Sequence, residues 1–186
     1  MLSYKVDDEI ELALPRPEID GPVVYRLIER QRDYLKEFLP WLDHLQNEEE
    51  EIIAFKEMMK NFGAGKSVTL VIHYQQTVAG MIDFHNINQS NRSADIGYWL
   101  SEDLQGKGIM TRAVAGMCSL GFNSFNFNRI TLTIECDNIP SQKVAERSGF
   151  MLEGKLRSYL NNRDDYKDAY FYSLLKDDGH EVTPES

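Results

Sequence analysis

The stretch LQGKGIMT, residues 104–111, is the most informative part of the sequence, because this glycine-bearing loop joins an expected strand to an expected helix. The strand before it is RSADIGYWL, residues 92–100, and apolar residues recur at helical spacing after it. Glycine at positions 106 and 108 permits backbone conformations closed to other residues, so neighbouring N–H groups can point at one centre. The dipole of the following helix adds partial positive charge there. The loop therefore predicts a pyrophosphate site, although a glycine turn with ordinary helix capping explains the same letters.

Two better-known nucleotide motifs do not match the chain. The dinucleotide fingerprint G-x-G-x-x-G, counted from Gly106, requires glycine where Thr111 stands. The segment GAGKS, residues 63–67, looks like a P-loop, but the glycine that must stand five positions before its Gly-Lys pair is a lysine here. This segment also follows an expected helix and precedes an expected strand, which is the reverse of the P-loop order. We expect its two glycines to end the helix instead.

The residues on either side of this loop predict a strand-helix-strand unit that is preceded by an antiparallel β-meander. The apolar strand RITLTIEC, residues 129–136, follows the helix, so the two strands should be parallel and their connection right-handed. Upstream, alternating patterns over 67–74 and 78–88 predict an antiparallel pair with a turn near Gln75 and Gln76.

The remaining elements complete an expected α/β (α+β) domain over residues 8–176. We expect a strand at 9–14, a helix opened by Asp20-Gly21-Pro22 and continuing to Leu35, a helix capped by Asn47, a short helix at 140–148, and strands at 150–159 and 167–175. The total is a mixed, mostly antiparallel seven-stranded sheet with a central parallel pair and about four helices. Residues 1–8 and the tail 177–186 are expected to be loose.

Composition limits the class of protein. With 186 residues and 42% apolar residues, the chain suits one domain. A formal charge of −10 argues against binding to a nucleic-acid backbone, and no apolar run approaches the roughly 18 residues that cross a bilayer. We read Cys118 and Cys136 as free thiols in a reducing cytoplasm, and we expect no nucleic-acid or membrane partner.

Gln105, Gly108 and Met110 resemble motif A, Q/R-x-x-G-x-G/A, of the GNAT N-acetyltransferases, although Met110 departs from the final Gly/Ala. Four segments in order, FLPWLDHL, IGYWLSEDLQGKGIMTRAV, NIPSQKVAERSGF and LEGKLR, are similar to the ribosomal-protein-alanine N-acetyltransferase branch. The resemblance covers nearly the whole expected domain.

This resemblance implies an acetyl-CoA-dependent transferase in which acetyl-CoA is the co-substrate. It also implies that the strands ending at Leu100 and Cys136 splay apart, leaving backbone groups that the amides of pantetheine can pair with. The implied cofactor-binding residues are Tyr98, Trp99, Leu100, Gln105, Gly106, Lys107, Gly108, Ile109, Met110, Thr111, Asn138 and Ser141. Asn138 and Ser141 can equally be ordinary helix caps.

The expected chemistry is direct attack of a primary amine on the thioester in a ternary complex. Ser141, or else Tyr159, is our candidate to protonate the departing thiolate, although Tyr159 can equally be a sheet aromatic. No base is assigned, because Ser158 stands where related enzymes can carry glutamate. Cys136 has no histidine near it in sequence, which argues against a covalent intermediate.

The acceptor is expected to be a protein N-terminus, with a small amine such as a polyamine or aminoglycoside as the alternative. Phe38, Trp41, Leu42 and Asp43 are expected to line its site, or else to pack a helical corner. The histidines at positions 44, 73, 85 and 180 lack metal-ligand spacing, so we expect no metal. A CoA-binding module without turnover, and self-association through the sheet edge or first helices, stay open.

Overall fold

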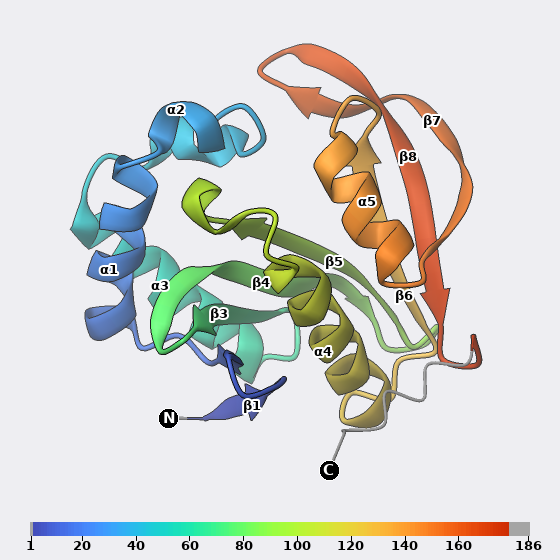
Figure 1. Ribbon diagram of the computed structural model, residues 1–186, viewed down its shortest axis with the longest axis horizontal. Coiled ribbons are helices and arrows are strands. Elements are labelled where there is room, and N and C mark those ends of the chain that lie inside the picture. Colours follow the sequence, from blue (N-terminus) through green and yellow to red (C-terminus); the bar gives the residue numbers. More distant parts are fainter. Residues whose placement is uncertain (1, 179–186) are drawn as a thin grey trace.

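The computed structural model describes residues 2–178, and most of the expected loose tail, 177–186, lies outside them. The elements in chain order are β1 (Ser3–Lys5), β2 (Ile10–Ala13), α1 (Pro17–Glu29), α2 (Arg32–Leu35), the 3-10 helix η1 (Pro40–His44), α3 (Glu48–Gly63), β3 (Val68–Tyr74), β4 (Thr77–Asn88), β5 (Ser93–Leu100), the 3-10 helix η2 (Glu102–Leu104), α4 (Ile109–Asn123), β6 (Arg129–Glu135), α5 (Ile139–Arg147), β7 (Met151–Asn162) and β8 (Asp165–Leu175). Figure 1 shows them around one sheet.

The sheet has eight strands in the order β1-β2-β3-β4-β5-β6-β8-β7. Every neighbouring pair is antiparallel except β5 and β6, which are parallel, as expected for strands joined through α4. The β3–β4 hairpin turns at Gln75 and Gln76, whose φ angles of 49° and 66° give the turn that matches strand twist. The expected meander and the strand-helix-strand unit are both confirmed.

The central parallel pair is joined along only part of its length. Its register covers Ser93 with Arg129, Ala94 with Ile130 and Asp95 with Thr131, and then stops. Beyond that point β5 continues beside β4 to Leu100, and β6 continues beside β8 to Glu135. The carboxyl ends of the two central strands therefore part, as the resemblance implied, and each keeps its outer neighbour.

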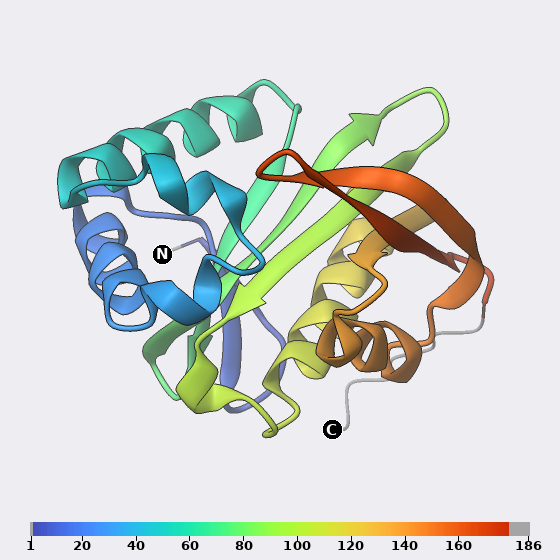
Figure 2. The ribbon, with the colours of Figure 1, turned by 90° about the horizontal axis from the view of Figure 1, so that it is seen from above.

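Helices cover both faces of the sheet, with α1 and α3 on one side and α4 and α5 on the other (Figure 2). Alternation along β5 divides the core between them: Ile96 packs in the cluster beneath α4, whereas Trp99 packs in the cluster beneath α1 and α3. The odd-numbered side chains of β5 and β6 therefore share the face of Trp99. None of the helices within 2–178 is both long and apolar enough to cross a membrane.

The structure corrects several expected boundaries in the first half of the chain. Residues 3–5 are not loose, because they form β1 and pair with β2, which makes eight strands rather than seven. The first helix begins at Pro17 and keeps Pro22 inside it, rather than opening at Asp20. It ends at Glu29, and α2 is separate, so there are five α-helices rather than about four. Proline at the first helical position needs no N–H partner, which explains the earlier start.

Other expectations about local structure hold. Asn47 caps α3 by accepting a hydrogen bond from the Glu50 amide at 3.0 Å. Gly63 is the last residue of α3, and Gly65, with φ of +67°, turns the chain out of it. GAGKS therefore lies between a helix and a strand, and the P-loop order is absent from this segment.

Candidate active site

The loop before α4 takes the backbone conformation that its glycines predict. Gly106 and Gly108 have φ angles of +74° and +70°, in the left-handed region that other residues adopt only with strain. A Cβ atom at either position would meet nothing within 4 Å. Glycine is therefore required here by backbone conformation, and the space beside both residues is open to a ligand.

The amino end of α4 carries amide groups without side-chain partners. Gly108 is the N-cap residue and has no side chain to accept from them, and the first turn holds no acidic residue. Ile109 and Met110 are buried in the core, which anchors the first turn of α4. The first amides of a helix have no intrahelical acceptor, and the dipole adds positive charge, so this end suits a diphosphate.

Gln105 is held in place by hydrogen bonds from both its backbone and its side chain. Its backbone N–H donates to the carbonyl of Glu102 at 3.1 Å, and its side-chain amide donates to the hydroxyl of Tyr34. Nearby, the Gln31 side chain donates to Ser101 Oγ at 2.9 Å and accepts from the Glu102 amide at 2.6 Å. Gln105 therefore helps to fasten the loop to the α1–α2 region. The carboxylates of Glu102 and Asp103, which would repel an anion, are exposed on η2.

Across the gap between the central strands, β5 meets the start of α5. The hydroxyl of Tyr98 donates to the carbonyl of Ser141 at 3.4 Å, and burial raises the pKa of Tyr98, which keeps it protonated. Asn138 caps α5 by accepting from the Ser141 amide at 3.2 Å, so the expected cap is confirmed. Trp99 is 9% exposed and packs under α1 and α3, which leaves only its backbone for the gap.

Glu135, which the sequence analysis did not single out, ends β6 at this gap. Its side chain is half-buried, and the Nδ2 group of Asn162 donates to its Oε1 at 3.3 Å. Burial raises the pKa of Glu135, and the neighbouring Asp137 raises it further. A carboxyl group held there with a raised pKa has the properties of a proton acceptor. Alternation along RITLTIE places Glu135 opposite Ile134, but its partner Asn162 lies 27 residues away and gave no signal in sequence.

The two candidate proton donors differ in placement. Ser141 is half-buried in the first turn of α5, beside Tyr98. Tyr159 is 57% exposed and lies in the stretch of β7 where the register with β8 shifts. The left-handed Ser158 beside it, with φ of +48°, donates its amide to Asp168 at 2.9 Å. The structure therefore brings Ser141, but not Tyr159, into contact with β5.

The expected acceptor residues are only partly available. Phe38 and Trp41 are exposed, but the side chain of Leu42 is 0% exposed and belongs to the core under α1 and α3. Asp43 is exposed but not free, because Arg163 donates to both of its carboxylate oxygens, at 2.6 and 3.0 Å. Leu42 is therefore a packing residue, and Asp43 is an anchor for the tip of the β7–β8 hairpin.

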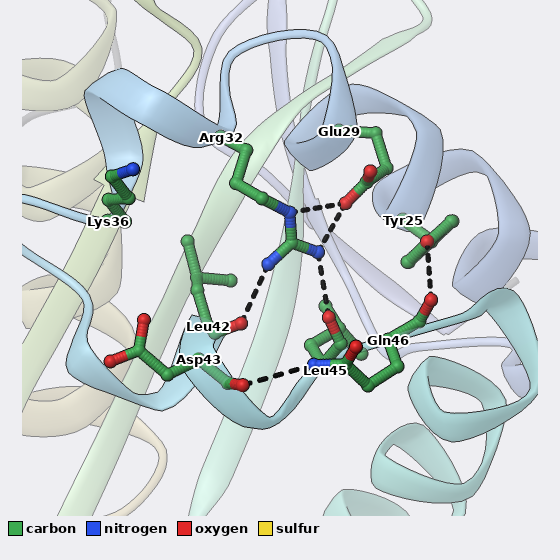
Figure 3. Close-up of a pocket in the computed structure, with 8 residues that line it drawn as sticks. All are labelled: Tyr25, Glu29, Arg32, Lys36, Leu42, Asp43, Leu45 and Gln46. Atoms are coloured by element: carbon green, nitrogen blue, oxygen red, sulfur yellow. Dashed lines mark hydrogen bonds and ion pairs between the residues drawn. The ribbon is translucent and has the colours of Figure 1, made fainter.

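A cavity of about 330 Å³ opens behind this segment (Figure 3). Its lining residues are Tyr25, Glu29, Arg32, Lys36, Leu42, Asp43, Leu45 and Gln46. The guanidinium of Arg32 lies at its centre, where it donates to the carbonyls of Leu42 and Leu45 at 2.7 and 2.8 Å and pairs with Glu29. These contacts already use the guanidinium of Arg32. We therefore infer that the residues around the cavity serve to support η1.

Metal coordination and the Cys118 thiol contribute nothing to the site in the part of the chain that the structure describes. Within residues 2–178, no group of three or more His, Cys, Asp or Glu residues is arranged to hold a metal ion. Burial raises the pKa of the Cys118 thiol, which makes it inert, and Cys136 is a half-buried free thiol at the end of β6.

A comparison with protein families identifies the family to which the chain belongs. The profile described as "Acetyltransferase (GNAT) domain" matches residues 10–151. The chain belongs to the GNAT acetyltransferase family. The ribosomal-protein-serine acetyltransferase of Escherichia coli (strain K12) is 30% identical to this GNAT chain over 175 residues, which cover 94% of the chain and 97% of the relative.

Solved structures agree with this GNAT assignment. The microcin C7 self-immunity acetyltransferase MccE, in complex with acetyl-CoA and AMP, has a TM-score of 0.88 and 30% identity, with 92% of this chain and 94% of that chain covered. The ribosomal L7/L12 alpha-N-protein acetyltransferase RimL, in complex with coenzyme A, has a TM-score of 0.90 and 26% identity, with 96% and 100% covered. The expected GNAT fold and N-acetyltransferase class are confirmed.

The residues of this GNAT chain suit the expected co-substrate, acetyl-CoA. Both structural relatives hold acetyl-CoA or coenzyme A, and the expectation of acetyl-CoA as acetyl donor is confirmed at the level of the family. The left-handed glycines and the uncapped start of α4 suit a diphosphate, and the parted strands suit a chain of amides.

Proposed function

We propose that this enzyme acetylates the α-amino group at the N-terminus of a protein, with ribosomal proteins as the first substrate class to test. One observation carries the proposal: an uncapped helix start, a parted strand pair and a half-buried carboxyl group occur together at one end of the sheet. The names of the relatives that cover the whole chain support the substrate class.

The amides from Gly106 to Met110 would hold the diphosphate of acetyl-CoA. These residues include the two left-handed glycines, and the N–H groups at the start of α4 point out of the helix. Gln105 is left out of this set, because its amide already donates to Glu102. Thr111 belongs to the same first turn and would add its amide.

The edge of β5 beyond Asp95 would bind the amide tail of the co-substrate. Backbone groups from Tyr98 to Leu100 face the gap where β6 has departed. An N–H group on this edge would polarise the thioester carbonyl, which develops negative charge when the amine attacks. When bound, acetyl-CoA supplies the thioester carbon that the amine attacks directly in a ternary complex.

Glu135 would accept the proton that the attacking amine loses. A free α-amino group has a pKa of about 7.7 to 8.0, so deprotonating it at pH 7 costs about 1 to 1.4 kcal/mol, against about 4.6 kcal/mol for lysine. A carboxylate with a raised pKa is a sufficient base for an α-amino group and a poor base for a lysine side chain. This difference favours an N-terminus over a lysine side chain as the acceptor.

Ser141 would return a proton to the departing thiolate. It lies in the first turn of α5, across the gap from Tyr98, and α5 begins there because Asn138 caps it. Tyr159 is the weaker candidate because its side chain is largely exposed on β7.

The experiment is a panel of amines mixed with acetyl-CoA, with release of free CoA thiol as the signal. Peptides with free N-termini, their N-blocked forms containing one lysine, and small polyamines are compared by kcat/KM. We expect the free N-termini to exceed the other two classes by at least about tenfold. Turnover confined to polyamines would contradict the proposed acceptor, and no thiol release from any amine would contradict the proposed reaction.

A small-molecule acceptor is the second candidate, and one observation favours it. MccE, a self-immunity enzyme against microcin C7, resembles this chain as well as RimL does. The same panel separates the two candidates when aminoacyl nucleotides and aminoglycosides are included.

A further inference from the structure

The tip of the β7–β8 hairpin connects the acceptor segment to the end of β6. Asn162 is the last residue of β7, and its Nδ2 group donates to the carbonyl of Glu37 at 3.1 Å and to Glu135 Oε1 at 3.3 Å. Arg163, the next residue, binds the carboxylate of Asp43 with two hydrogen bonds. Figure 2 shows the tip reaching from the β8 side of the sheet toward the α2–η1 region.

Hydrogen bonds of the side-chain oxygen and of both N–H groups fix the orientation of the Asn162 amide. Its oxygen accepts from Arg163 Nη1 at 3.0 Å, while its two N–H groups point to Glu37 and Glu135. A flipped amide would direct its oxygen at a carboxylate and a carbonyl, which both accept only. The result is a continuous hydrogen-bonded chain from Asp43 through Arg163 and Asn162 to Glu135.

We propose that Asn162 is a positioning residue, which holds the carboxylate of Glu135 toward the acceptor amine and ties it to the backbone of the acceptor segment. This inference rests on the proposed function, in which Glu135 accepts the proton of the amine. The bond to Glu37 fixes Asn162 against the segment before η1, and the bond to Glu135 transmits that position to the base. Movement of the acceptor segment would therefore change how the base is held.

Asn162 is presented by a tight, hydrogen-bonded hairpin turn. Arg163 and Asp164 have φ angles of +54° and +63°, which form a two-residue hairpin turn that pairs Asn162 with Asp165. The side chain of Asn161 accepts from the Asp164 amide at 2.8 Å and closes the turn from the other side. Asn161 thus shares the turn with Asn162 without bonding to Glu135, which makes it a matched control.

Charged groups around Glu135 give the sign of the expected effect. Asp137 before α5 and Asp165 on β8 raise the pKa of Glu135, whereas the hydrogen bond from Asn162 and the charge of Lys167 on β8 lower it. The Asn162 N–H favours the charged carboxylate, so its removal should raise the pKa of Glu135. This shift is a property of the free enzyme and can be measured without turnover.

The test compares Asn162→Ala with Asn161→Ala in the full chain. The pKa of Glu135 is followed through its side-chain carboxyl carbon by NMR, with Glu135→Gln used to assign the resonance. We expect Asn162→Ala to raise the pKa and to lower kcat between about 10- and 100-fold, with KM for acetyl-CoA unchanged. Asn161→Ala should leave the pKa of Glu135 at its wild-type value.

The outcomes separate this inference from the proposed function. An unchanged pKa in folded Asn162→Ala, or an equal shift in Asn161→Ala, would overturn the positioning role even if the enzyme turns over normally. Full activity of Glu135→Gln would instead overturn Glu135 as the base, and the positioning role with it. If Asn162→Ala fails to fold, Asn162→Asp keeps the side-chain size but adds an acceptor beside Glu135, and the same rise in pKa is required.

Discussion

Gly108 shows how one residue can set the backbone of the proposed co-substrate site through its own conformation. Its φ of +70° is accessible to glycine, while a branched residue there pays about 1 to 2 kcal/mol in backbone strain. It is also the N-cap of the helix whose amides face the proposed diphosphate. Glycine is required at position 108 by its backbone conformation rather than by crowding, because a Cβ there would meet nothing within 4 Å.

We predict that Gly108→Val abolishes measurable acetyl-CoA binding in titration calorimetry, because it distorts the loop and adds bulk where the backbone must meet phosphate. Gly63→Ala is the control: Gly63 ends α3 without a left-handed φ, and a Cβ there also meets nothing within 4 Å. Retention of wild-type affinity in Gly108→Val would place the cofactor elsewhere.

Glu135 is the second residue on which the account depends. We predict that Glu135→Gln lowers kcat by about 10²- to 10⁴-fold, the range for loss of a general base, and leaves the Kd for coenzyme A unchanged. Glu57→Gln, on the exposed side of α3 where Glu57 pairs with Lys60, should leave both values unchanged. Steady-state kinetics and calorimetry measure the two quantities, and equal kcat in Glu135→Gln and wild type would remove Glu135 from the mechanism.

At the level of secondary-structure elements, the contact between β4 and β5 fixes the position of the β5 backbone that is proposed to bind the co-substrate. Gly80 pairs with Leu100, and a Cβ at Gly80 would lie 2.1 Å from the carbonyl oxygen of Trp99. Alanine there must push β5 away from β4 at the residues proposed to bind pantetheine. Close approach of two strands, rather than a special φ, therefore requires this glycine.

We predict that Gly80→Ala lowers the free energy of unfolding by at least about 2 kcal/mol, as overpacking against backbone does. Urea denaturation followed by circular dichroism measures the change. Gly154→Ala on β7, where a Cβ meets nothing within 4 Å, should change stability far less. Equal stability of the two variants would contradict the packing of β4 on β5.

The helix α3 carries a buried acid, which gives the stability a definite pH dependence. Glu51 is 2% exposed, and burial raises its pKa from 4.5 to about 7. Because the folded chain holds this proton more tightly than the unfolded chain, the contribution of Glu51 to stability falls as pH rises from about 4.5 to about 7. Above that window the full penalty of burying the charge applies.

We predict that Glu51→Gln raises the free energy of unfolding at pH 8 by up to about 3 kcal/mol and gains less at pH 5. Urea denaturation at the two pH values gives the comparison, with Glu49→Gln in the exposed first turn of α3 as the control. A gain that is the same at pH 5 and pH 8 would show that Glu51 keeps an ordinary pKa in the folded chain.

At the scale of the whole molecule, local sequence predicted the centre of the fold better than its edges. The loop 104–111 and the strands around it were predictable, because glycine spacing, helical periodicity and alternation all report on short-range structure. The three-residue strand β1 was missed, since so short a strand has little pattern and depends on β2 beside it. For Leu42 the sequence left a site-lining role and a packing role open, because its full burial depends on how η1 packs under α1.

The contacts that link the expected acceptor segment to the β7–β8 hairpin and to β6 could not be predicted, because they join residues far apart in the chain. Arg163 binds Asp43 across 120 positions, and Asn162 reaches both Glu37 and Glu135. Neither hairpin residue belongs to a recognisable pattern. The sequence therefore indicated the half of the site proposed to bind the co-substrate, while Glu135 and its neighbours emerged only from tertiary structure.

The central claim is that the amides of residues 106–110 hold a diphosphate while β5 and β6, parted beyond Asp95 and Thr131, receive its amide tail. A crystal structure of the chain with coenzyme A tests this most directly. We expect phosphate oxygens within hydrogen-bond distance of those amides and pantetheine alongside Tyr98 to Leu100. Coenzyme A bound away from the start of α4, or β5 and β6 paired to their ends, would contradict it.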